Sequence, residues 1–290
     1  MLKKLMKHEW NALGRLLLPL YALLLITAPL AGLLNYASSS GLAKIQTGNP
    51  NINLFLQTGF GIILLLLNIL LVFELIGIAV ANIILVAMRF YKSMTGEEAY
   101  LTHTLPVTMH SLIISKTLIA SLFEILSSVV ILVSSLLYGL CCGNTKQLSS
   151  FPSSLADFFA VFSKQSEGVF ILPSIGFVIL IILTLLVTNL HVFASVALGH
   201  LITKHRVAGS FGMYIVINYA KQFLTFILMF LYMMLKAKSM DSHLNNMSET
   251  HAISYMLTHF EGILLVITIL TLAILYYIIY HVFTRKLNLD

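Results

Sequence analysis

The chain has 290 residues, of which 59% are apolar and 10% are charged, and its mean hydropathy is +0.95. A soluble domain carries about 25% charged residues, so this composition excludes a soluble protein and leaves no room for a separate soluble domain. The formal net charge of +6 is typical of membrane topology, and we expect no nucleic-acid partner. The prediction is a single all-α polytopic membrane domain over residues 1–290.

The first segment, residues 1–14, is basic and amphipathic. Its apolar residues recur at the spacing of one helical face: Leu2, Leu5, Met6, Trp10 and Leu13. A basic helix that carries a tryptophan is typical of the membrane interface. We expect an interfacial (elbow) helix that contacts the lipid of the inner leaflet and then turns into the first span. The alternative is a frayed basic tail.

The rest of the chain alternates between apolar runs and polar connections. Six runs have about 20 residues or more, which is the length needed to cross a hydrocarbon core about 30 Å thick. The runs cover roughly residues 16–36, 55–88, 111–140, 169–201, 208–235 and 262–283. We therefore expect six transmembrane helices.

The basic residues in the termini, in the loops and near the ends of the spans indicate the orientation of the protein. Eleven lie on one side: Lys3, Lys4, Lys7, Arg15, Arg89, Lys92, Lys116, Lys204, Arg206, Arg285 and Lys286. Five lie on the other: Lys44, Lys146, Lys164, Lys236 and Lys238. Cytoplasmic loops carry the excess of lysine and arginine, so we expect both termini in the cytoplasm.

The connection over residues 89–110 is polar and contains a predicted helix over residues 97–105. Gly96 ends the preceding helix, and Glu97 and Glu98 follow where the macrodipole of a new helix favours acidic residues. Pro106 stops the helix, because the residue before a proline leaves the helical region. The alternative is an ordinary cytoplasmic turn. The apolar side chains with which this helix could dock are those of Tyr100, Leu101 and Leu105.

The segment before the last span, residues 248–260, is amphipathic and too short to cross a membrane. Its apolar face contains Ile253, Met256, Leu257 and Phe260. We expect a short re-entrant helix that dips into the outer leaflet.

Polar residues inside the spans are candidates for function, because they are costly in lipid. The candidates are Glu74, Glu124, His191, Asn218 and Lys221. In one interpretation they line a translocation path, and in the other they hold helices together by hydrogen bonds. Lys221 could pair with Glu74 or with Glu124, and the sequence does not choose between them.

The sequence contains no motif for catalysis or for ATP binding. It has no GxxxxGK[ST], HExxH or GxSxG. The ten histidines show no metal-ligand spacing, and the adjacent Cys141 and Cys142 define neither a disulfide framework nor a metal site. We therefore expect a chain that is not an enzyme and binds no cofactor, so energy-coupled work would need a partner chain.

Residues 89–116, RFYKSMTGEEAYLTHTLPVTMHSLIISK, resemble the loop between the second and third spans of type 2 (ABC-2-like) ABC exporter permeases. The matching features are Arg89-Phe90-Tyr91, Gly96-Glu97-Glu98, Tyr100-Leu101, Thr104-Leu105-Pro106 and Ser115-Lys116. The strong match covers 28 residues. Six spans, inner termini, an interfacial first helix and a dipping segment before the last span agree with that family along the whole chain.

The resemblance implies a permease subunit that pairs with a second permease, often an identical copy, and with two ATPase subunits that hold ATP and Mg. The loop would be the coupling helix that docks on the ATPase, with Glu97, Glu98, Tyr100, Leu101 and Leu105 as its contact residues. In Gram-positive bacteria, small permeases of this kind commonly export peptides or protect against them. The layout is similar to that of permeases of phenol-soluble-modulin exporters.

We therefore expect a cell-membrane exporter of an amphipathic or hydrophobic substrate, such as a toxin or antimicrobial peptide. One alternative is a peptide-sensing or immunity permease that clears antimicrobial peptides from the membrane. A second is a stand-alone channel or secondary carrier that uses Glu74, Glu124 and Lys221 as an ion relay. A neighbouring reading frame with a P-loop would favour either ABC interpretation over the lone carrier.

Overall fold

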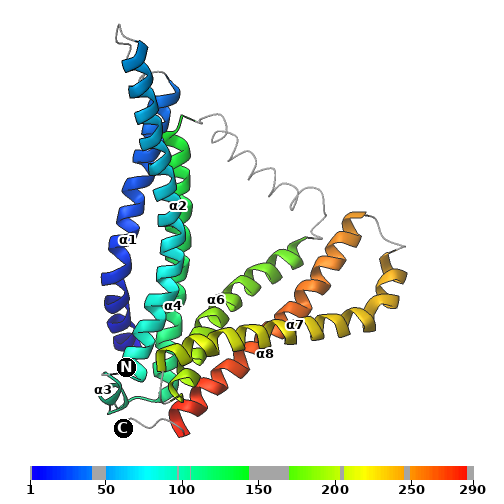
Figure 1. Cartoon of the computed structure of the whole chain (residues 1–290). Coiled ribbons are helices and arrows are strands. Elements are labelled where there is room, and N and C mark those ends of the chain that lie inside the picture. The colour runs from blue at the N-terminus through cyan, green and yellow to red at the C-terminus, as the bar shows by residue number, and fades with distance from the viewer. Residues whose placement is uncertain are drawn as a thin grey trace. The chain divides into compact units, whose positions relative to one another are not determined.

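A computed structural model describes residues 2–40, 50–96, 98–104, 106–143, 170–202, 206–244 and 249–285. All regular secondary structure in these residues is α-helical (Figure 1). The helices are α1 (Leu2–Ser39), α2 (Pro50–Met94), α3 (Ala99–Thr104), α4 (Met109–Cys141), α6 (Ile171–His200), α7 (Arg206–Leu244) and α8 (Glu249–Arg285). The predicted all-α fold is confirmed.

Six of these helices, all except α3, are long and apolar enough to cross a membrane. They coincide with the six apolar runs of the sequence. Many of their largest apolar side chains are exposed, including Phe73, Phe177 and Phe226. Soluble monomers rarely expose so much apolar surface, and a helix is one of the few structures that satisfies its backbone groups in lipid. The architecture is that of a multi-pass membrane protein.

At two places where the sequence predicts a separate short helix before a span, the structure has one continuous helix. α1 is continuous from Leu2 to Ser39 and contains Pro19 and Pro29, so no break separates residues 2–14 from the first span. α8 likewise joins residues 249–260 to the last span. The placement of these two segments at the membrane surface, as an interfacial helix and a re-entrant helix, stays a prediction.

The contacts within the chain form two compact units where the sequence predicts one domain. Unit one comprises Met1–Glu9, Val86–Ser121 and Asp157–Asp290, and unit two comprises Trp10–Leu85 and Leu122–Ala156. The division falls inside α1, α2 and α4, so each of these helices contributes to both units.

Unit two is built from the long parts of α1, α2 and α4. α1 approaches α4 very closely at Gly32, where an added Cβ would lie 2.6 Å from the carbonyl oxygen of Tyr138. Only a residue without a side chain fits at such a distance. Small residues commonly allow this close approach between membrane helices.

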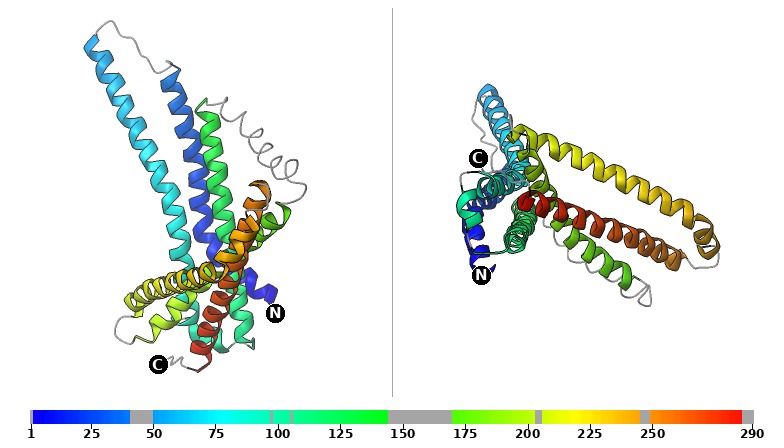
Figure 2. Two further views of the ribbon diagram at one scale, coloured as in Figure 1. Left: turned by 90° about the vertical axis from the view of Figure 1, so that its right-hand side faces the viewer. Right: turned by 90° about the horizontal axis from the view of Figure 1, so that it is seen from below.

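Unit one is organised around α6, which packs against both α7 and α8 (Figure 2). Most of the second half of α6 is buried. Phe90, near the end of α2, stacks on Phe193 of α6 with ring centroids 4.0 Å apart and meets Phe283 of α8 edge-on at 5.8 Å. Such aromatic pairs contribute beyond their buried area, and here they tie the end of α2 to α6 and α8.

Candidate functional site

The end of α2 is a tight turn that redirects the chain into α3. α2 ends at Met94, and the amides of Thr95 and Gly96 both donate to the carbonyl oxygen of Tyr91, at 2.9 and 2.8 Å. A Cβ at Gly96 would lie 3.0 Å from the Cα of Lys92. The small residue at this position therefore lets the chain turn closely against the last turn of α2.

α4 begins at Met109, two residues before the predicted start of the span at Ser111. The amide of Ser111 donates to the Thr108 hydroxyl at 3.4 Å, and side-chain oxygens at this position stabilise helix starts. The sequence predicts a short helix between Gly96 and Pro106, and α3 occupies that place. Its role as a coupling helix stays a prediction.

α3 has one side turned inward and one turned outward. Ala99 is buried, whereas the side chains of Tyr100 and Leu101 are 70% and 66% exposed. Of the predicted docking residues, these two are available on the surface. Glu97 and Leu105 lie outside the described residues.

Glu98, another predicted docking residue, forms ion pairs with residues of the same chain. Its carboxylate accepts a hydrogen bond from Arg89 Nη1 at 2.8 Å and lies 3.7 Å from Lys92 Nζ. The carboxylate therefore anchors the start of α3 to the last turns of α2, an arrangement that spacing alone did not indicate.

Arg89 connects this anchor to a second carboxylate. Its Nε lies 3.3 Å from Glu9 Oε2, so the guanidinium bridges Glu9 and Glu98. The other oxygen of Glu9 is 2.5 Å from Lys116 Nζ, and Lys116 also donates to Ser93 Oγ at 2.7 Å. We name Glu9, Arg89, Glu98 and Lys116 the ion cluster.

The inner half of the ion cluster is buried. The side chain of Lys116 is 5% exposed and that of Glu9 is 10% exposed. Buried charges are tolerated only when they are paired and hydrogen-bonded. Two cations and two carboxylates balance in formal charge, so each member depends on the others.

The ion cluster could not be predicted from the sequence. In the sequence, Arg89 and Lys116 stand out only as basic residues that indicate topology and as parts of the pattern over residues 89–116. One signal was present, because Glu9 is the single acidic residue in the basic segment 1–14. An isolated acid among lysines does not identify its partner, which here lies more than a hundred residues away on α4.

In unit two, the two candidate carboxylates of the spans are both half-buried. Glu74 on α2 accepts a hydrogen bond of 2.5 Å from the hydroxyl of Thr27 on α1. The main-chain carbonyl of Glu124 accepts from the Ser128 hydroxyl at 3.0 Å. The Glu74 contact joins two helices, as expected for an interhelical hydrogen bond.

In unit one, His191 on α6 is buried and stacks on Tyr214 of α7, with ring centroids 4.5 Å apart and planes inclined by 6°. Its Nε2 lies 3.2 Å from the carbonyl oxygen of Tyr214. Asn218 and Lys221 are half-buried on α7. Pairing of Lys221 with either carboxylate involves residues of different units and stays a prediction.

Two polar networks in unit two were not anticipated. In the first, Ser127 Oγ lies 2.6 Å from the Tyr21 hydroxyl and accepts from Asn82 Nδ2 at 3.0 Å. This network joins α1, α2 and α4 through one buried hydroxyl.

The second network is a pair of amides. Asn35 and Asn68 donate to each other at 3.2 and 3.3 Å, and the Tyr138 hydroxyl donates to Asn68 Oδ1 at 3.0 Å. It again joins α1, α2 and α4. Hydrogen bonds of this kind commonly hold membrane helices together.

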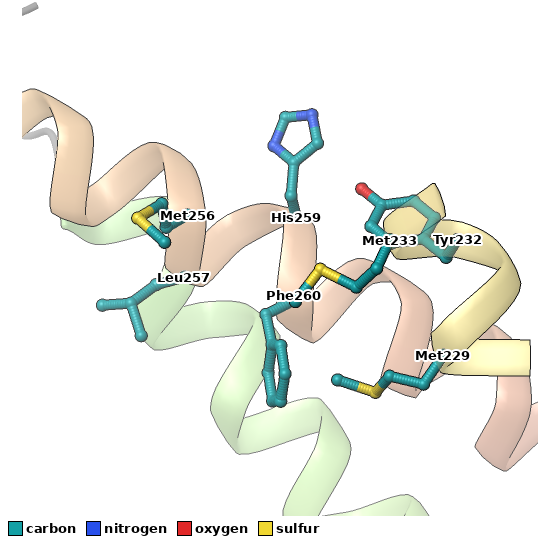
Figure 3. A pocket seen from close by; sticks show the side chains of 7 residues that line it. All are labelled: Met229, Tyr232, Met233, Met256, Leu257, His259 and Phe260. Atoms are coloured by element: carbon teal, nitrogen blue, oxygen red, sulfur yellow. The ribbon is translucent and has the colours of Figure 1, made fainter. Parts of the chain in front are cut away.

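A pocket of about 230 Å³ opens between α7 and the first turns of α8, within unit one (Figure 3). Its lining consists of methionine, leucine, aromatic and histidine side chains: Met229, Tyr232, Met233, Met256, Leu257, His259 and Phe260. Three of these, Met256, Leu257 and Phe260, belong to the apolar face predicted for residues 248–260. That face therefore lines a pocket shared with α7.

Metal-binding groups are not assembled in the described part of the chain, where no cluster of three or more His, Cys, Asp or Glu residues occurs. Cys141 and Cys142 are both free and half-buried at the end of α4.

Comparison with known proteins adds no further information, since no protein-family model, curated protein or solved structure matches the chain.

Proposed function

We propose that this chain is the membrane subunit of an ATP-driven exporter, and that α3 docks on a separate ATPase. The observation that carries the proposal is the geometry of α3. Tyr100 and Leu101 point two large apolar side chains outward, while Glu98 and Ala99 fix the start of the helix on unit one. Exposed aromatic and aliphatic side chains on a fixed base suit a protein–protein contact. The resemblance of residues 89–116 to exporter loops supports the same role.

The proposed complex contains two copies of this chain and two ATPase subunits, in the membrane of a Gram-positive cell. ATP and Mg would be held by the ATPases. ATP binding brings the ATPases together, and α3 transmits that motion to the spans. Such coupling requires that the ATP-bound and empty states of the ATPase bind α3 differently.

The proposed substrate is an amphipathic or hydrophobic molecule such as a peptide. The pocket between α7 and α8 supports this class, because methionine and aromatic side chains adapt to irregular apolar ligands. Two polar residues of the spans further support an apolar substrate, because their contacts join helices of the protein. Glu74 bonds Thr27 within unit two, and His191 contacts Tyr214 within unit one. A path for ions or sugars would need more polar groups open to the cargo.

The test is co-purification from native membranes through a C-terminal tag, followed by an ATPase assay. The variant is Tyr100→Ala/Leu101→Ala, which removes the outward side chains of α3. The matched control is Val207→Ala/Phe211→Ala at the start of α7, where the two side chains are 71% and 69% exposed.

We expect wild type and control to retain an ATPase that the α3 variant loses. A lone polypeptide from wild-type membranes, with no ATPase activity, would overturn the proposal. Equal retention by the α3 variant would overturn the role of α3.

A further inference from the structure

We infer that Glu9, Arg89 and Lys116 are positioning residues that hold α3 in place on unit one. The functional meaning of this inference rests on the proposed docking of α3, but the positioning itself can be measured without any partner. None of the three residues belongs to α3, and none was predicted to contact an ATPase.

The first step is that α3 cannot hold its own position. It has six residues, and so short a helix is not stable in isolation. Its ends are set by a turn after α2 and a capped start of α4. Within unit one, the Arg89–Glu98 ion pair of 2.8 Å connects it to the last turns of α2.

The second step is that Arg89, which holds α3, is itself held in place by other residues. Arg89 has Glu9 on its other side, and Glu9 is fixed by Lys116. The ion cluster therefore joins four segments of the chain: the start of α1, the end of α2, the start of α3 and the first turns of α4. A guanidinium is suited to this position, because its planar fork can bond two carboxylates at once.

The third step is a gradient of exposure along the ion cluster. Lys116 is 5% exposed, Arg89 16% and Glu98 36%. Water screens the outer pair more than the inner one. The outer bond is therefore the one that a force on α3 would break first, while the inner pair keeps Arg89 in place to re-form it.

The fourth step connects this anchor to the spans. Phe90, the residue next to Arg89, stacks on Phe193 and meets Phe283. One turn of α2 thus holds α3 through Arg89 and holds α6 and α8 through Phe90. A displacement of α3 acts directly on the part of unit one that carries the last three spans.

The experiment measures the mobility of α3 in the full chain. Thr104, exposed at the end of α3, is replaced by cysteine in a Cys141→Ser/Cys142→Ser background and labelled with a nitroxide. The protein is reconstituted in phosphatidylglycerol–phosphatidylethanolamine vesicles without any partner. The variants are Glu9→Gln, Arg89→Gln and Glu98→Gln. The matched control is Lys92→Gln, which also removes a cation from Glu98, but one that is 3.7 Å away and 57% exposed.

We expect the rotational correlation time of the label to fall by a factor of about two or more in all three variants, as for a backbone that passes from ordered to flexible. The control should match wild type. Glu98→Gln acts at the exposed end of the ion cluster, so it remains informative if a buried variant fails to fold. Unchanged mobility in Glu9→Gln or in Arg89→Gln, or an equal change in Lys92→Gln, would overturn the inference.

This outcome is independent of the proposed function. A mobile α3 in the variants together with no co-purifying ATPase would support the positioning and refute the exporter. A co-purifying ATPase together with unchanged mobility of the label in the variants would support the exporter and refute the positioning.

Discussion

Unit one and unit two use polar side chains in different ways. Unit two joins its helices with hydroxyl and amide groups, as in the Tyr21–Ser127–Asn82 network, together with one carboxylate at Glu74. Unit one concentrates charge in the ion cluster around Arg89. Neutral hydrogen bonds suffice where helices only need to stay together. A fixed set of opposite charges also specifies one geometry for a short element such as α3.

The largest effect should come from breaking the buried pair of the ion cluster. Lys116→Met leaves Glu9 buried beside a single remaining cation, and we expect the free energy of unfolding to fall by about 3 kcal/mol or more. Unfolding in mixed micelles at increasing denaturing detergent measures this loss.

The double variant Glu9→Gln/Lys116→Met is its control. Replacing both partners of a buried pair is often close to neutral, so the double variant should be more stable than Lys116→Met alone. Equal losses in the two variants would contradict a pairing between these residues.

A neutral network of unit two should cost less to break. Asn68→Ala removes the partner of Asn35 and of Tyr138, and we expect a loss of about 1 kcal/mol, since interhelical hydrogen bonds in membranes contribute about 0.6 kcal/mol each. The same unfolding assay measures it. A loss as large as that of Lys116→Met would remove the distinction between the two units.

Glu74 allows a further test of the difference between the two units, because it is a carboxylate in unit two, where most contacts between helices are neutral. Glu74→Gln keeps an acceptor for the Thr27 hydroxyl, so we expect a change in unfolding free energy of less than about 1 kcal/mol and unchanged transport. Glu74→Ala, which removes the acceptor, should cost more stability than Glu74→Gln. Loss of transport in Glu74→Gln with normal stability would instead favour an ion relay.

The smallest effect should come from Lys92→Gln. Lys92 is exposed and 3.7 Å from Glu98, and exposed ion pairs contribute about 0–1 kcal/mol. We expect unfolding within about 0.5 kcal/mol of wild type, and a comparison at low and high salt should reveal little difference between the two proteins. A loss comparable to that of Lys116→Met would show that the exposure of an ion pair does not determine how much it contributes to stability.

The sequence by itself determined the class of the protein and its helices. Apolar runs of sufficient length predicted six spans, because crossing a membrane requires about 20 apolar residues irrespective of what the helix contacts. Gly96 and Pro106 likewise indicate where α3 lies, because the missing side chain of a glycine and the fixed ring of a proline act on the backbone locally. The same short segment predicted Tyr100 and Leu101 as docking residues, and their side chains are exposed.

Only the tertiary structure decided which polar residues meet. Glu9 and Lys116 are separated by 107 positions, and nothing in either local pattern indicates the other. Ser127 joins three helices, whereas the hydroxyl of the neighbouring Ser128 donates to the carbonyl of Glu124 on its own helix. The physical reason is that one residue, which is about 100° of rotation about a helix axis, separates a contact from an exposed position. That rotation is set by packing between helices, at points such as Gly32 and Phe90, and not by the composition of any single span.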